Sequence, residues 1–316
     1  MKHLSRAPEN VHYLLNGKME PRLQVKSGEV VKVECVRADA NYLNKANPVF
    51  KDRTEVLELR SNPVTGPIFI EGAEPGDWLD VDILDIQLGD DGTEGYYTYV
   101  PGQGIFSNPF CSWDYPAQTE FCDVTKEQLE LNFANKKVLT KNEPFIGTIA
   151  TAPKEDVIAA YYSSKEWLGN VDCQQIRKGS SVVIPVNVKG ALLSLGDLHA
   201  KQGAGEMLGC AIESAGIVTL RINVLKKENA GYIGWPQVNR TEFIGSLGFV
   251  HYSLEKAIQE AVYDLTQRVM EINKTQFMET FMFLSQLVEI ELCQFTGSQS
   301  CTVLAKIDRQ SVGATK

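Results

Sequence analysis

The sequence predicts an α+β fold that is rich in β-strands, arranged as a sandwich or barrel, with its helices at the C-terminal end. Segments in which apolar and polar residues alternate, the pattern of half-buried strands, are spread over the chain before residue 225. Apolar residues three and four apart, the pattern of a helix, come only after residue 253. Strands first and helices last are typical of α+β proteins and not of alternating α/β proteins.

The clearest strands are expected at residues 30–35, 78–86 and 213–224, where apolar side chains alternate with charged or polar ones. Shorter β segments are expected at 67–71 and 143–153. Residues 180–188 are rich in β-branched side chains, but Pro185 within them indicates an edge strand or a bulge. Residues 90–104, rich in Gly, Asp and Tyr, indicate a long excursion. Residues 121–136 give no clear pattern.

Two helices are expected near the C-terminus. Ser253 is a suitable N-cap for the first, which has an apolar stripe from Leu254 to Val269. Thr275 is the expected cap of the second. We expect the apolar side chains of this second helix to pack in the core: Met278, Phe281, Met282 and Phe283.

Composition sets limits on domain number and on function. The chain has 316 residues, of which 43% are hydrophobic and 22% charged, enough for a sizeable core. We expect one domain over residues 1–316, with an N-terminal β half (1–150) and a second half (151–316) that carries the helices. A net charge of -9, without a basic block, argues against binding to nucleic acid or an anionic membrane.

Cysteine usage and hydropathy indicate the compartment. The seven cysteines are odd in number and dispersed, without a CxxC pair, so neither a disulfide framework nor a cysteine zinc site is expected. No run of about 18 apolar residues, the length of a membrane-spanning helix, is present. The N-terminus has no secretory apolar region. The sequence therefore predicts a reduced, cytoplasmic protein.

One segment concentrates the residues capable of acid-base chemistry. Residues 196–213 read GDLHAKQGAGEMLGCAIE and contain one of only four histidines in the chain. Glycines at four positions let the backbone turn tightly or approach a ligand closely. The candidate site residues of this segment are Asp197, His199, Gln202, Glu206 and Glu213.

The spacing of these residues is compatible with a metal site. Asp197 and His199 are two apart, so on a strand both point to one face. Imidazole nitrogen and carboxylate oxygen are ligands for zinc and other divalent ions. Glu206 or Glu213 could return towards that face, and a further carboxylate could act in proton transfer. The alternative is structural: an Asp beside a His is commonly a hydrogen-bonded pair, and Asp in turns commonly caps its own backbone.

Two cysteines are alternative candidates for catalysis. Cys173 and Cys210 could act as thiol nucleophiles, although neither has a histidine beside it in the sequence. Buried thiols of the core are the simpler interpretation for both. The glycines at 203, 205 and 209 have the spacing GxGxxxG, which is not that of a dinucleotide-binding loop.

Residues 196–213 resemble the signature of the acetamidase/formamidase family. Further blocks resemble that family in the same order: residues 63–86, beginning PVTGPIFIEGAEPGD; residues 147–153, GTIATAP; residues 168–172, LGNVD; and residues 179–193. The resemblance covers most of the chain. It implies hydrolysis of short linear amides of the formamide or acetamide type to carboxylate and ammonia, a β-rich fold with C-terminal helices, and a homodimer or larger homo-oligomer.

The resemblance also implies a divalent metal, with zinc preferred and calcium as the alternative. On the matching positions, Asp197, His199 and Glu213 are the expected metal ligands, while Glu206, with His199 and Asp197, is expected to act in catalysis. The residues expected to contact substrate are Asn170, Asp172, Gln202 and Glu71.

The chain departs from the family pattern at one central position. Where the family usually has QGDGE, this chain has Ala204 between Gly203 and Gly205, so a carboxylate is replaced by a methyl group. If that carboxylate binds metal or orients water, the activity is weakened. The alternative function is therefore a weak or inactive family member that binds a small ligand or a metal.

Overall fold

The computed structural model describes residues 1–58, 62–107, 115–250, 253–296 and 301–314. Cys111 and His251 lie outside them. Two large β-sheets dominate these residues, in agreement with the predicted fold class. The strands of the first sheet, in spatial order, are β1 (Lys2–Leu4), β5 (Val30–Cys35), β19 (Gly216–Leu225), β7 (Trp78–Leu88), β16 (Ser181–Pro185), β20 (Gln237–Asn239), β21 (Phe243–Phe249), β23 (Cys301–Asp308) and β22 (Glu289–Phe295).

The second sheet carries the motif segment. Its strands, in order, are β14 (Ser163–Ser164), β15 (Leu168–Asn170), β12 (Phe145–Ala150), β17 (Leu193–Lys201), β18 (Ile212–Ser214), β8 (Gly95–Tyr99) and β9 (Gln118–Cys122), with β6 (Val64–Glu71), β2 (Val11–His12) and β4 (Leu23–Lys26) joined through β17. Two smaller pairs are β10 (Gln128–Phe133) with β11 (Lys136–Lys141) and β3 (Leu14–Asn16) with β13 (Val157–Ala159). The α-helices are α1 (Arg53–Glu58), α2 (Leu254–Asn273) and α3 (Phe277–Leu287).

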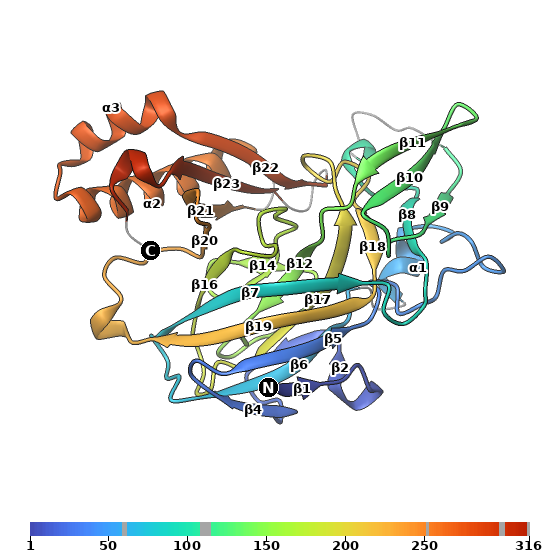
Figure 1. The fold of residues 1–316 in the computed structure, drawn as a ribbon, viewed down its shortest axis with the longest axis horizontal. Helices are drawn as coiled ribbons and strands as arrows, with labels where there is room; N and C mark the ends of the chain where they lie inside the picture. The colour runs from blue at the N-terminus through green and yellow to red at the C-terminus, as the bar shows by residue number, and fades with distance from the viewer. Residues whose placement is uncertain (59–61, 108–114, 251–252, 297–300, 315–316) are drawn as a thin grey trace.

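The two sheets share one apolar core. β7 and β19 cross in front of β12 and β17 in Figure 1, and the inward side chains of both layers form one cluster. Val81 and Val218 of the first sheet belong to this cluster together with Ile146 and Leu195 of the second. The predicted alternation is confirmed in β5, where Val31, Val33 and Cys35 are buried and the residues between them are half-buried. The arrangement is a β-sandwich, which stabilises the protein by removing both apolar faces from water.

The prediction of an edge strand or bulge at Pro185 is wrong. β16 lies inside the first sheet, between β7 and β20. Proline is tolerated because it is the last residue of the strand, and β20 pairs only with residues 181–183. The backbone N–H that proline lacks is therefore not needed on that side. Residues 121–136, which gave no clear pattern, contain the end of β9, all of β10 and the first residue of β11.

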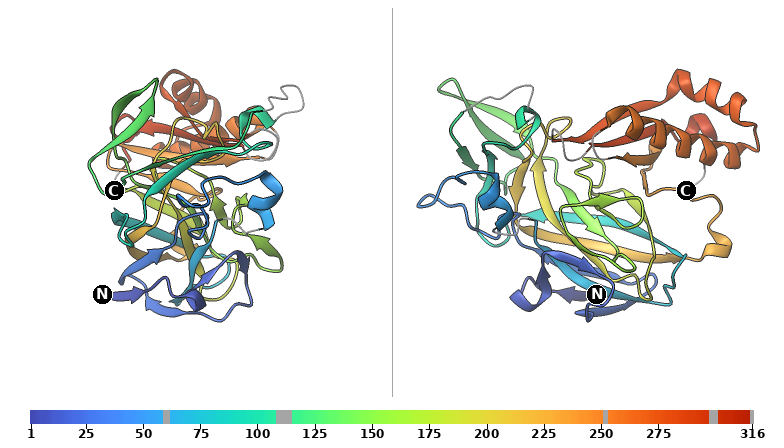
Figure 2. Two further views of the ribbon diagram at one scale, coloured as in Figure 1. Left: turned by 90° about the vertical axis from the view of Figure 1, so that its right-hand side faces the viewer. Right: turned by 180° about the vertical axis from the view of Figure 1, so that it is seen from behind.

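The predicted cap of α2 is confirmed. The Ser253 hydroxyl accepts a hydrogen bond from the backbone N–H of Lys256 at 3.2 Å. Ala257, Ala261 and Leu265 are buried in the cluster that joins α2 to β21 and β23. Figure 1 shows α2 and α3 together with β20–β23 at one end of the molecule and the β10–β11 hairpin at the other, and the rear view of Figure 2 shows the same separation. Among the described residues, no helix has the length and apolarity required to cross a membrane.

The predictions for α3 are wrong in two respects. Its N-cap is Gln276, while the Thr275 hydroxyl lies 2.6 Å from that of Thr280. Within this helix, burial is confined to Thr280 and Leu284, and Leu284 belongs to the apolar cluster that contains Ala257 and Ala261 of α2. The four side chains expected in the core are instead exposed: Met278, Phe281, Met282 and Phe283.

Candidate active site

Four carboxyl groups and one imidazole converge on the second sheet. Asp197 and His199 point from β17, and Glu213, on the neighbouring strand β18, is the register partner of His199. Asp172 follows β15, and Glu206 lies in the turn between β17 and β18. All five side chains are buried, which is unusual for carboxylates unless they are paired or bind a cation.

His199 lies at the centre of the cluster. Its Nε2 is 3.4 Å from Oδ1 of Asp197 and 3.2 Å from Oε2 of Glu213. The ring packs edge-on against Phe145 at a centroid distance of 4.8 Å. Two groups of three possible ligand atoms share His199, and within each group all atoms lie within 4.8 Å of one another: Asp172 with Asp197 and His199, and His199 with Glu206 and Glu213. The expected ligand set of Asp197, His199 and Glu213 is thus divided between two groups, and Asp172 joins the first.

The backbone is unusual at three of these residues. Asp172, Asp197 and Glu206 have φ values of 46°, 59° and 49°, in the left-handed region that side chains other than glycine rarely adopt. The pairing of β17 with β18 also shifts register between His199 and Lys201. Such strain and such bulges are concentrated at functional sites, where they aim side chains that a regular strand would direct elsewhere.

Burial and mutual repulsion govern the charges of the cluster. Burial, together with the charges of Glu206 and Asp197, raises the pKa of Asp172 well above its usual value. Burial also raises the pKa of Glu206 to about 7, against the opposing influence of His199. For His199 burial favours the neutral ring, but the charges of Glu213 and Asp197 outweigh it and raise its pKa well above the usual value. The cluster therefore has an excess of negative charge, which protons or a bound cation must offset.

The donor set fits a divalent cation. Asp172 Oδ1 and His199 Nδ1 are buried without a hydrogen-bond partner among the described residues, while His199 Nε2 and Glu213 Oε2, which form no hydrogen bond, face each other at 3.2 Å. Buried polar atoms are normally paired, so such a group of atoms indicates a missing ligand. Gly147 provides the space: a Cβ there would lie 2.7 Å from carboxylate oxygens of Asp172 and Asp197 and 2.8 Å from Cε1 of His199. Nitrogen and carboxylate oxygen suit zinc, and carboxylates also suit calcium.

Several contributors to the site were not predicted. The Thr148 hydroxyl donates to Asn170 Oδ1 at 2.6 Å, and the Asn62 side-chain amide donates to Asp197 Oδ2 at 2.9 Å. Gln294, on β22, donates to carboxylate oxygens of Asp172 and Glu206. Gly147 and Thr148 lie in a block that carried the family resemblance, and Asn62 directly precedes another. No sequence signal indicated Gln294.

The residues expected to contact substrate have different positions. Asn170 is in the cluster and donates to Asp172 Oδ2 at 3.2 Å. Gln202 donates instead to two backbone carbonyls, those of Asp172 at 3.0 Å and Cys293 at 2.8 Å. Glu71 lies at the end of its strand that is opposite to the end beside the site. It is the last residue of β6 and pairs with Lys26, whereas the first residue, Val64, is the register partner of Gly196 beside the site.

The cysteine and alanine positions bear on the alternative functions. Cys173 is fully buried. Burial and the charge of Glu213 raise the pKa of the Cys210 thiol well above its usual value, which disfavours the thiolate that a nucleophile requires. Burial favours the interpretation of Cys173 as a core thiol, and the raised pKa argues against Cys210, which is only partly buried, as a nucleophile. Ala204 is exposed at the turn, unlike the buried members of the cluster.

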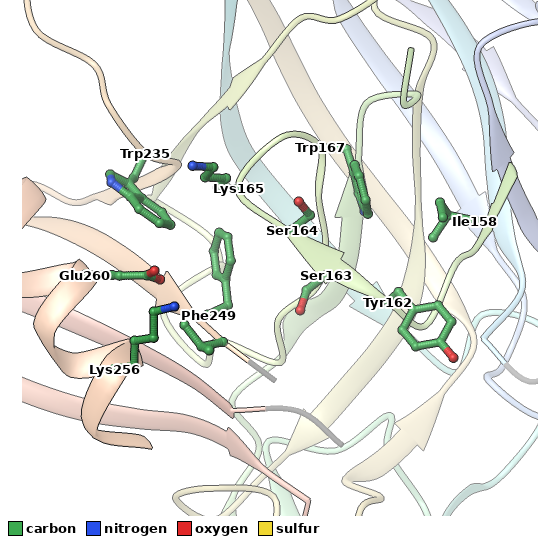
Figure 3. Close-up of a pocket in the computed structure, with 11 residues that line it drawn as sticks. Ile158, Tyr162, Ser163, Ser164, Lys165, Trp167, Trp235, Phe249, Lys256 and Glu260 are labelled. Carbon is green, nitrogen blue, oxygen red and sulfur yellow. The ribbon is translucent and has the colours of Figure 1, made fainter. Parts of the chain in front are cut away.

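A separate cavity lies between the β14 region and the start of α2. It has a volume of about 590 Å³, and Figure 3 shows Trp235, Trp167 and Phe249 around it. Lys165 lies 5.0 Å from the centre of the Trp235 ring. The lining contains no residue of the carboxylate cluster. This cavity is therefore distinct from the cluster.

The sequence matches a known family over most of its length. The profile of the acetamidase/formamidase family matches residues 2–168 and 160–269. A putative formamidase of Schizosaccharomyces pombe is 30% identical over 250 residues, and the formamidase of Methylophilus methylotrophus is 29% identical over 248. Each match covers 64% of this chain and 61% of the relative, so the chain aligns with about three fifths of the length of these relatives.

A solved structure supports the match over the whole chain. The crystal structure of an acetamidase from Bacillus halodurans superimposes with a TM-score of 0.86 at 28% identity, and 98% of each chain is covered. The similarity therefore includes both sheets and the C-terminal helices.

Proposed function

The chain belongs to the acetamidase/formamidase family, and from this premise we propose that it hydrolyses the C–N bond of a short linear amide to a carboxylate and ammonia. The observation that carries the proposal is the buried cluster of Asp172, Asp197, His199, Glu206 and Glu213, several of whose polar atoms lack a partner among the residues described. A buried set of carboxylates with an imidazole is costly to fold and suits proton transfer and cation binding.

We assign Asp172, Asp197 and His199 as the residues that would hold a divalent cation, with zinc preferred and calcium as the alternative. Such a cation polarises a carbonyl group and lowers the pKa of water. Asn62 donates to Asp197 Oδ2 at 2.9 Å, and the Thr148 hydroxyl lies 3.2 Å from the same oxygen, so both side chains help to hold that carboxylate in position.

Proton transfer is assigned to Glu206. Its pKa of about 7 lets it exchange a proton near neutral pH, as a general acid-base group requires. In this role it takes a proton from water and passes it to the departing nitrogen. Glu213 is fixed by the backbone N–H of Ala211, which donates to Oε1 at 3.1 Å, and its other oxygen points towards His199 Nε2.

The alternative function, a weak or inactive member that binds a small ligand or metal, depended on Ala204. Ala204 is exposed, whereas the five residues of the cluster are buried and all are present in this chain. This favours the enzyme.

The test is ammonia release from formamide, acetamide and propionamide by the purified protein, before and after chelation and with metal added back. Metal content is measured in parallel by elemental analysis. We expect release that chelation abolishes and zinc restores. Release that survives complete removal of metal would keep the amidase and reject the metal. A folded protein that releases no ammonia from any of the three amides would reject the amidase.

Three further assignments accompany this function. We propose that residues 1–316 act as one domain, that the protein works in the cytoplasm, and that it forms a homodimer or a larger homo-oligomer. The dispersed cysteines, all free among those described, support a reducing compartment. The shared core of the two sheets, which draws on residues before and after position 150, supports a single domain.

A further inference from the structure

Gln294 reaches the carboxylate cluster from a part of the chain that the family profile does not match. The match ends at residue 269, and Gln294 lies on β22, beyond α3. Its side chain is buried, with 4% of the residue exposed. The C-terminal strands therefore contribute a polar group to a site whose five other members all lie in the part of the chain that the family profile matches.

Backbone contacts bring β22 to the motif turn. The backbone N–H of Gly205 donates to the carbonyl of Leu292 at 2.9 Å, and that of Phe295 donates to the carbonyl of Gly205 at 2.7 Å. Gly205 has a φ of 79°, and a Cβ on it would lie only 2.8 Å from Cδ2 of Leu292. Glycine is favoured at this position by its positive φ, and the nearby Leu292 side chain of β22 leaves little room for a Cβ.

A bulge in β22 turns Gln294 inward. The pairing of β22 with β23 shifts register between Leu292 and Gln294, so that Cys293 and Gln294 are both buried although they are consecutive. In a regular strand consecutive side chains point to opposite faces of the sheet, and a bulge lets two consecutive side chains point to the same side. Gln202 fixes the arrangement, because its amide donates to the backbone carbonyls of both Asp172 and Cys293.

The amide group of Gln294 is anchored at its nitrogen and unpaired at its oxygen. Nε2 donates to Asp172 Oδ2 and to Glu206 Oε2, the latter at 3.3 Å. Oε1 is buried and has no hydrogen-bond partner in the part of the chain that the structure describes. A buried acceptor without a donor is unfavourable, and one that lies beside the proposed proton-transfer residue indicates a ligand with an N–H group.

We propose that Gln294 is a substrate-binding residue whose Oε1 accepts a hydrogen bond from the NH₂ group of the amide, so that the site selects amides over esters with the same acyl group. The inference rests on the proposed amidase function. An ester has an oxygen where the amide has NH₂, so it offers no donor, and its lone pairs face those of Oε1. A buried polar group that loses its partner in this way discriminates strongly against the analogue.

The test compares acetamide with methyl acetate in wild type and in Gln294→Met, which keeps the length of the side chain but removes both polar atoms. We expect kcat/KM for acetamide to fall by about 10- to 100-fold, mainly through KM, because the lost bond is made to bound substrate. For methyl acetate we expect less than about a 3-fold change, measured as kcat/KM or, where it is not turned over, as the inhibition constant against acetamide. The matched control is Gln175→Met. Gln175 donates to Glu291, which lies on β22 like Gln294, but Gln175 does not touch the cluster.

Each remaining outcome overturns the inference. Equal losses for acetamide and methyl acetate would show that Gln294 only positions Asp172 and Glu206. No loss for acetamide in a folded variant would show that Oε1 is not used. Wild type without amide hydrolysis would reject the proposed function and the inference with it. Thermal melting checks the fold, and if Gln294→Met does not fold, Gln294→Asn, which withdraws the oxygen by one methylene, is judged by the same comparison.

Discussion

Two regions of the molecule depart from the usual distribution of side chains in opposite ways: the turn between β17 and β18 buries charged groups, and the helix α3 exposes apolar ones. The turn and its flanking strands bury charged side chains: Asp197 is 2% exposed and Glu206 is 7% exposed. α3 exposes apolar ones: Met278 is 61% exposed and Met282 is 65% exposed. Each region departs from the usual rule that charges face water and large apolar groups do not.

The difference shows which of the two departures is costly. Burial of unpaired charge disfavours folding strongly, so the cluster persists only because it is held by the sheet and, as we propose, by a cation. Exposed apolar groups cost little in the folded chain, because water solvates them in the unfolded chain as well. The buried carboxylates, which lower the stability of the folded chain, therefore indicate a functional site. The four predictions below test this contrast, from the largest expected effect to the smallest.

Glu206→Gln is expected to lower kcat/KM for acetamide by about 100- to 10,000-fold, because the variant cannot transfer a proton. The melting temperature should be almost unchanged, since the burial that raises the pKa of Glu206 to about 7 disfavours its charge and Gln is neutral. Ammonia release and thermal melting measure the two effects. Glu9→Gln, at an exposed glutamate, is the control. Full turnover by Glu206→Gln would remove Glu206 from catalysis.

Leu284→Ala and Met282→Ala test the two sides of α3. Leu284 is fully buried, so its truncation is expected to lower the free energy of unfolding by about 2–5 kcal/mol. Met282 is exposed, and its truncation should change the free energy of unfolding by no more than about 0.5 kcal/mol. Urea unfolding measures both variants. Equal losses would mean that Met282 is covered in solution, for example by a second copy of the chain.

Gly147→Ala should disturb the cluster through a single methyl group. The added Cβ lies 2.7–2.8 Å from atoms of Asp172, Asp197 and His199, which must move to admit it. We expect a loss of about 1–3 kcal/mol in stability and of at least about 10-fold in activity. Gly203→Ala is the control, because a Cβ there meets nothing within 4 Å. If Gly147→Ala has the activity of wild type, the space beside Gly147 is not needed for a ligand.

Ala204→Asp should have the smallest effect. Because Ala204 is exposed, an aspartate there should face solvent, and kcat/KM should stay within about 2-fold of wild type. The measurement is acetamide hydrolysis at saturating metal. A large gain of activity would restore the alternative in which this chain is a weakened family member.

Much of the sandwich could be predicted because its signals are local. The alternation in β5 and β7 and the Ser253 cap each depend on residues within a few positions of one another. The motif segment could also be predicted, since His199 and Glu213 lie only 14 positions apart in the sequence and pair across adjacent strands. Glu71 belongs to the same sheet, yet its distance from the site depends on strand register, which the sequence pattern did not reveal.

The sequence alone determined the family, the β-rich class with C-terminal helices, and the stretch from Asp197 to Glu213 that carries most of the chemistry. Tertiary structure decided the rest. It selected Asp172 as a neighbour of His199, it brought Gln294 from β22 to the same carboxylates, and it left one side of α3 uncovered. The physical reason is that periodicity and caps act between near neighbours in the chain, whereas a buried site is made of groups that only the packing of distant strands brings within reach of one another.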